Sequence, residues 1–169
     1  MKNTFIIFIV FITFLSCEKE KINDSFNGYY TIEYTNWAWG YQHNGWVIDM
    51  QGRVMSFDLP VKWNKVDSLG YISKENLLEN ITNCDSKIED VSNNNLIKYS
   101  TLINKAINGN ISTKINTAND AGQTSYICYQ FDTDLGLYKK IILKEQGDFS
   151  FHNESQEAKK IIKWMNNIE

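Results

Sequence analysis

The chain has 169 residues and a formal net charge of −3, with 17 Lys and Arg against 20 Asp and Glu. This length suits one domain with a hydrophobic core and is short for two. The mildly acidic balance argues against a nucleic-acid partner, which requires a clustered basic surface.

The N-terminus has the layout of an export signal. Lys2 supplies a positive charge, Phe5–Leu15 is almost wholly apolar, and Ser16 precedes Cys17. The apolar stretch is too short for an ordinary membrane span, which needs about 20 apolar residues. The charged run that begins at Glu18 cannot enter hydrocarbon cheaply. The pattern therefore predicts cleavage after residue 16.

The run Phe14-Leu15-Ser16-Cys17 resembles the lipobox of bacterial lipoproteins, although the family pattern prefers Leu where Phe14 stands. The resemblance implies that the Cys17 sulfur carries a diacylglycerol and that acyl chains such as palmitate hold the protein on the membrane. The acidic residues after Cys17 resemble the surface-export tag of Bacteroidetes-type lipoproteins. This implies a cell-envelope protein and favours the outer face of the outer membrane. The alternatives are an ordinary secreted protein with a chance cysteine and an uncleaved anchor.

These observations divide the chain into a signal peptide at 1–16, a lipidated cysteine with a polar tether at 17–27, and a single domain at 28–169. Two cysteines remain in the domain, Cys84 and Cys128. Export to a compartment that permits disulfides allows them to pair. The alternative is two buried free thiols that behave as small apolar residues. The sequence does not decide between these two states.

Alternating residues predict strands in the first part of the domain. In the segment 29–35, one face holds Tyr30, Ile32 and Tyr34, and the other holds Thr31, Glu33 and Thr35. A second extended run covers 46–50, and Gln51-Gly52 turns the chain into a third at 53–57. The domain is thus expected to open as an antiparallel meander.

Helical spacing takes over in the middle and returns at the C-terminus. Ser73 is a suitable N-cap for a short helix, a longer helix precedes Gly109, and a last helix begins near Ser155. Between them, 110–123 reads as a loop with a short strand at 111–115, and strands are expected at 124–131, 137–144 and 148–152. The expected fold is α+β: an antiparallel sheet of about five to seven strands packed by two or three helices, including a C-terminal helix.

The C-terminal third contains Asp120-Ala121-Gly122, Gly147-Asp148, Asn153-Glu154-Ser155, Ala158 and Trp164. This pattern resembles one that recurs at the C-terminus of uncharacterised bacterial lipoproteins. The resemblance implies no activity. Gly147-Asp148 is expected to mark a tight turn and Ser155 a helix cap.

Aromatic residues are densest between positions 37 and 46, where Trp37, Trp39, Tyr41, His43 and Trp46 occur with two glycines. Exposed aromatic faces on a loop bind sugar rings or the apolar face of a peptide. In the alternative interpretation the tryptophans enter the core or cover the end of the sheet. His43, between Gln42 and Asn44, is expected to be solvated or to lie in a turn.

No catalytic motif is present, so an enzyme is not expected, and neither is a cofactor or a metal. Glu33, Asp49 and Asp58 could form an acid/base pair of the kind that glycoside hydrolysis uses, but such carboxylates occur in any protein of this size. Asp132-Thr133-Asp134 is explained by turn chemistry rather than by calcium. Three functions remain: a non-catalytic envelope lipoprotein with a structural or protein-interaction role, which is the favoured one, a carbohydrate- or peptide-binding module, and a small hydrolase. The expected partners are the membrane and an envelope protein or glycan.

Overall fold

A computed structural model describes residues 28–168, which form nine strands and three helices. The predicted signal peptide, Cys17 and the tether lie outside the described residues. In chain order the elements are β1 (Gly28–Asn36), β2 (Gln42–Ile48), β3 (Arg53–Asp58), β4 (Tyr71–Ile72), α1 (Lys74–Thr82), β5 (Ser86–Asp90), α2 (Asn93–Ala106), β6 (Ile115–Asn116), β7 (Gln123–Asp132), β8 (Leu137–Gly147), β9 (Phe149–His152) and α3 (Gln156–Met165).

The strands form one antiparallel sheet in the order β5-β3-β2-β1-β7-β8-β9-β6, and β4 pairs with β8. The central strand β1 joins the N-terminal meander to the C-terminal one, with Ile32 opposite Trp46 on one side and opposite Tyr126 on the other. The predicted α+β class, the antiparallel sheet and the C-terminal helix are confirmed. The sheet has more strands than expected, partly because β4 and β6 are only two residues long.

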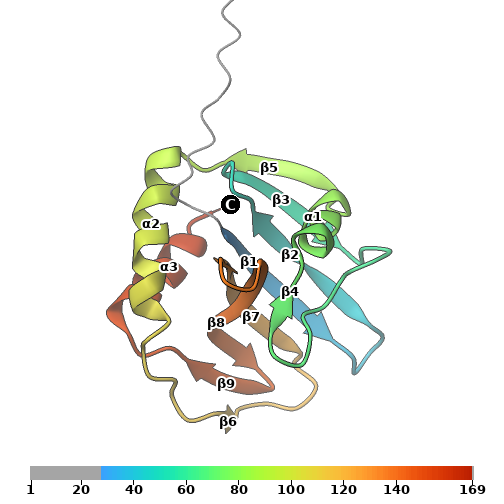
Figure 1. Cartoon of the computed structure of the whole chain (residues 1–169). Coiled ribbons are helices and arrows are strands. Elements are labelled where there is room, and N and C mark those ends of the chain that lie inside the picture. Colours follow the sequence, from blue (N-terminus) through green and yellow to red (C-terminus); the bar gives the residue numbers. More distant parts are fainter. Residues whose placement is uncertain (1–27, 169) are drawn as a thin grey trace, which may run out of the picture.

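Both faces of the sheet are covered (Figure 1). On one face, α2 and α3 bury Tyr30, Ile48 and Cys128. On the other face, α1 and β4 enclose Tyr29 and Val47. Because successive residues of a strand point to opposite faces, β1 contributes Tyr29 to one core and Tyr30 to the other. The result is three layers, with the sheet in the middle.

The helices begin at serine caps, as the sequence predicts at two of the three positions. The Ser73 Oγ accepts a hydrogen bond from Asn76 N at 3.2 Å at the start of α1, and the Ser155 Oγ accepts one from Ala158 N at 3.1 Å at the start of α3. These bonds satisfy backbone donors that the first turn of a helix leaves free. The apolar stripe of α3 then packs on the sheet through Ala158, Ile161, Trp164 and Met165.

Two strands were not predicted, and one was placed differently. β5 is exposed along its whole length, so it has no alternation of apolar and polar residues to read. β4 is too short to show a period. Of the strand expected at 111–115, only the last residue belongs to β6, which covers Ile115–Asn116. Ile111 makes an isolated bridge with Asn153.

The two cysteines of the domain are free thiols. Cys128 belongs to the core under α2 and α3, whereas Cys84 packs against the core under α1. The sheet therefore separates the two sulfur atoms.

Among residues 28–168, no helix has both the length and the apolar character needed to cross a membrane.

Candidate functional site

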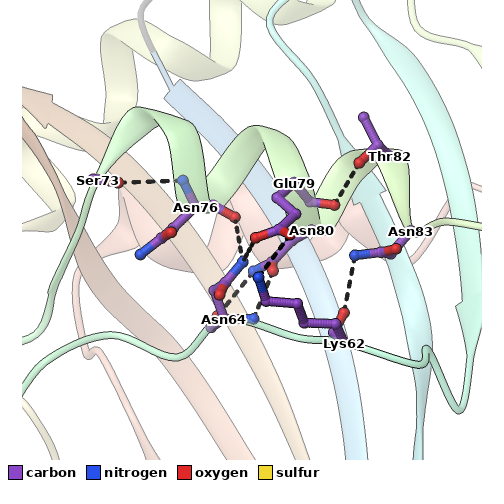
Figure 2. Close-up of polar contacts among 8 residues, drawn as sticks. All are labelled: Lys62, Asn64, Ser73, Asn76, Glu79, Asn80, Thr82 and Asn83. Atoms are coloured by element: carbon purple, nitrogen blue, oxygen red, sulfur yellow. Dashed lines mark hydrogen bonds and ion pairs between the residues drawn. The ribbon is translucent and has the colours of Figure 1, made fainter.

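The segment that follows β3 is fastened to α1 by side-chain hydrogen bonds (Figure 2). Asn80 of α1 is 2% exposed and binds both backbone groups of Asn64: its Oδ1 accepts from Asn64 N at 2.7 Å, and its Nδ2 donates to Asn64 O at 2.9 Å. The Asn64 Nδ2 donates to Glu79 Oε2 at 2.7 Å, and Lys62 Nζ contacts Glu79 Oε1 at 2.7 Å. These bonds hold a loop that carries Trp63 and Lys65 over the sheet.

A cavity of about 300 Å³ lies between this loop and the face of the sheet that α1 covers. Its walls come from β1, β2, β7, β8, the β1–β2 turn and the loop. We call it the Glu33 pocket, and its principal residues are Glu33, Trp37, Tyr41, His43, Trp63, Lys65 and Lys140.

Glu33 lies on β1, two residues beyond the buried Thr31 and on the same face of the sheet. Its Oε1 atom is buried and has no hydrogen-bond partner. Burial raises the pKa of the Glu33 carboxyl, while the charge of Lys140 and a hydrogen bond from Trp63 act in the opposite direction. An oxygen in this position loses water without gaining a protein partner, so it is available to a bound molecule.

Aromatic rings form a continuous wall beside this carboxyl group. The ring centroids of Trp37 and Tyr41 are 4.2 Å apart, and those of Tyr41 and His43 are 6.1 Å apart. His43 then meets Trp63 at 5.1 Å and Phe57 at 5.0 Å. The wall is buried at its inner end and exposed at its outer end, where Trp37 is 69% exposed.

His43 is 3% exposed, so the prediction of a solvated or turn residue is wrong. The reason is that β2 begins at Gln42, four residues before the predicted start at 46, and points the imidazole inward between Phe57 and Trp63. Burial lowers the pKa of His43, and the charges of Lys65 and Lys140 lower it further. The imidazole is therefore neutral at pH 7.

The predicted aromatic cluster divides in three. Trp37, Tyr41 and His43 come together in the Glu33 pocket. Trp39 is 82% exposed and is not part of the lining. Trp46 points to the opposite face and packs against the core under α2 and α3, as the alternative interpretation expects for a core tryptophan.

The three carboxylates considered for an acid/base pair are also separated. The Asp49 carboxylate accepts hydrogen bonds from Arg53 N at 2.9 Å and Arg53 Nε at 2.6 Å, which closes the β2–β3 turn. Asp58 is exposed on β3. Glu33 is the one carboxyl group in the lining of the pocket, so a pair of carboxyl groups is not found there.

The sequence did not indicate Trp63, Lys65 or Lys140 as site residues. Lys140 lies on β8 between Tyr138 and Ile142, which pack into the core under α1. The period of two along 138–142 is the signal that could have placed it on the covered face. Trp63 and Lys65 lie outside helices and strands, where no period applies.

A second cavity of about 300 Å³ adjoins the first, because Thr35 and Trp37 line both. Its other residues include Asp120, Gly122 and Asp148. Trp37 therefore stands between a pocket with two lysines and a pocket with two aspartates. Among residues 28–168, no group of three or more His, Cys, Asp or Glu side chains is arranged to hold a metal ion.

Comparison of the chain with protein-family models, with curated proteins and with solved structures finds no match.

Proposed function

We propose that this chain is a lipid-anchored envelope protein whose domain binds a saccharide unit in the Glu33 pocket without acting on it chemically. One observation carries the binding role: an exposed aromatic wall stands beside a buried carboxyl oxygen that has no partner in the fold. A purely structural role gives no reason to bury the Oε1 atom of Glu33 without a partner, because burial of an unsatisfied polar atom destabilises the fold.

A sugar ring matches both halves of this pocket. Its C–H face stacks on an exposed ring such as Trp37, and its hydroxyl groups donate and accept hydrogen bonds, so they satisfy Glu33 in either protonation state. The cavity volume of about 300 Å³ is at the lower end for small-molecule sites and suits one such ring.

An extended peptide fits less well. Peptides that bind sheets usually add a strand at an open edge. The pocket, however, lies over β1, whose two edges are already paired with β2 and β7. The floor of the pocket offers no free backbone ladder.

Tryptophan fluorescence tests the binding role, since Trp37 and Trp63 both line the pocket. Titration of the full mature chain with monosaccharides is expected to shift the emission. Trp37→Ala should weaken binding by roughly fivefold or more, because an aromatic contact contributes about 1 kcal/mol beyond its buried area. Trp39→Ala is the matched control and should leave affinity unchanged, because this ring is outside the lining. No response to any saccharide, or equal losses in the two variants, would contradict the proposal.

The anchor is tested separately at Cys17. In cells, Cys17→Ser should abolish incorporation of labelled palmitate and move the protein out of the membrane fraction. Unchanged membrane partitioning would refute the lipid anchor and would leave the binding role untouched.

A further inference from the structure

We propose that the Glu33 pocket selects an acidic sugar, a six-membered ring that carries a carboxylate, and that this carboxylate lies toward Lys65 and Lys140. The inference rests on the proposed saccharide binding and names the class of sugar. It is carried by the placement of charge around the cavity.

The two lysines reach the pocket from different layers of the fold. Lys140 comes from β8 in the sheet, and Lys65 comes from the loop that Asn80 holds in place. Neither lysine takes part in any ion pair found among the described residues. The Lys65 Nζ instead lies 6.0 Å from the centroid of the Trp37 ring. Two ammonium groups thus face a cavity that contains a single carboxyl group.

The charges of the two lysines act on titratable groups inside the cavity. Lys65 and Lys140 both lower the pKa of His43, and Lys140 also acts on Glu33. With the imidazole neutral, the lining has a net charge of about +1 when Glu33 is ionised and about +2 when it is protonated. In either state an anionic group on the ligand gains more from the pocket than a hydroxyl group does.

The adjoining cavity fixes the direction in which such a ligand binds. It contains Asp120 and Asp148 and shares Trp37 with the Glu33 pocket. Like charges repel, so a carboxylate placed on the Asp148 side of Trp37 is disfavoured. The ring can stack on Trp37 with its carboxylate toward the lysines and its opposite side toward Asp120 and Asp148. A longer glycan would then continue with neutral units into the second cavity.

Fluorescence titration of the full mature chain tests the inference. The probes are glucuronic and galacturonic acid, each compared with its parent hexose and with its methyl ester, which keeps the ring and removes the charge. We expect at least one acid to bind about tenfold more tightly than its ester, as a charge-assisted contact allows. This preference should shrink as salt is raised, because the lysines are reached by solvent.

Lysine variants test whether the ammonium groups of the pocket bind the carboxylate of the ligand. Lys140→Met should reduce the preference for the acid over the ester to less than about threefold. The matched control is Lys139→Met, which removes the neighbouring exposed lysine of β8, a residue outside the lining. It should leave the preference intact. Lys65→Met changes an exposed loop residue and serves as a second variant if Lys140→Met lowers the urea midpoint of unfolding.

The outcomes distinguish failure of the acidic-sugar inference from failure of saccharide binding. If acids and esters bind equally well, the acidic-sugar inference is overturned and the proposed saccharide binding stands. The same conclusion follows if Lys139→Met removes the preference as fully as Lys140→Met does. If no sugar of either kind binds, the inference and the proposed function both fail.

Discussion

Asn153 and Glu33 are both polar side chains inside the fold, and they differ in how the protein satisfies them. Asn153 is 1% exposed. Its Nδ2 donates to Ala106 O at 2.6 Å, and its Oδ1 accepts from Ser155 N at 3.0 Å. It therefore ties the end of α2 to the start of α3. Glu33 keeps Oε1 buried with no partner.

The difference separates polar groups that hold the fold from polar groups that serve a ligand. Both side-chain polar groups of Asn153 are used by the fold itself, and one oxygen of Asp148 is used likewise: its Oδ1 accepts from Ala121 N at 2.8 Å. Both residues belong to the C-terminal sequence pattern noted above, so their side chains in that pattern serve architecture. The Oε1 atom of Glu33 has no such use, and Glu33 lines a cavity.

The largest expected effect is the loss of stability on replacing Asn153, the polar residue that holds the fold. Asn153→Ala leaves Ser155 N without its partner and removes one of the donors to Ala106 O, which keeps the hydrogen bond from Gly109 N. Because both bonds of a buried side chain are lost, the variant should lower the free energy of unfolding by about 2–4 kcal/mol. Urea denaturation measures this change. Asn119→Ala is the control, because Asn119 is exposed and should cost less than about 0.5 kcal/mol. Equal losses in the two variants would show that the hydrogen bonds of Asn153 do not stabilise the fold.

A smaller effect is expected where the architecture supports the site. Asn80→Ala removes both hydrogen bonds to the backbone of Asn64 and should lower the free energy of unfolding by about 1–3 kcal/mol. It should also weaken saccharide binding, because the loop with Trp63 and Lys65 loses its attachment. Asn76→Ala is the control for both measurements, because it changes an exposed side chain one turn earlier in the same helix and keeps the backbone oxygen that accepts from Asn64. Unchanged affinity in Asn80→Ala would separate the loop from the site.

The smallest effect concerns Glu33 itself and depends on pH. A carboxyl group whose pKa is raised on folding binds more protons in the native state, so it lowers the free energy of unfolding as pH rises from its ordinary value of 4.5. Glu33→Gln removes this penalty. The variant should therefore gain stability over the natural protein as pH rises through this window, by at most about 1.4 kcal/mol per pH unit. Urea midpoints measured from pH 4 to 8 give the difference.

His43 provides a control of opposite sign within the same pocket. Its pKa is lowered on folding, so the unfolded state binds more protons, and the natural protein loses stability as pH falls below 6.5. His43→Phe should accordingly gain on the natural protein as pH falls, whereas Glu33→Gln gains as pH rises. Differences that run in the same direction in the two variants would rule out this assignment.

Local signals were sufficient for much of the fold. Alternation at 29–35 predicted β1, Gln51-Gly52 predicted the turn between β2 and β3, and serines predicted the starts of α1 and α3. In each case the physical cause lies within a few neighbouring residues. β5 could not be predicted in this way. Its residues 86–90 are all exposed and show no alternation, and it is a strand because it pairs with β3.

The site was only half predictable for a related reason. The segment 37–46 indicated Trp37, Tyr41 and His43, which are close in sequence. Alternation along 29–35 places Glu33 on the face opposite the apolar Tyr30 and Ile32. By this pattern alone, Glu33 is expected to face solvent. It becomes covered only when a loop and a helix from beyond residue 59 fold over that face. Periodicity states which residues share a face, and it does not state what will lie on top of that face.

The exposed strand β5 also bears on association between copies of the domain. An open sheet edge invites strands from other molecules. β5 presents Lys87, Glu89 and Asp90 along this edge, and Lys87 pairs with Asp90 within the strand. Its register with β3 shifts between Val54 and Met55. A short, charged and irregular edge is a poor template for pairing with a strand of another molecule, so this edge of the domain resists aggregation.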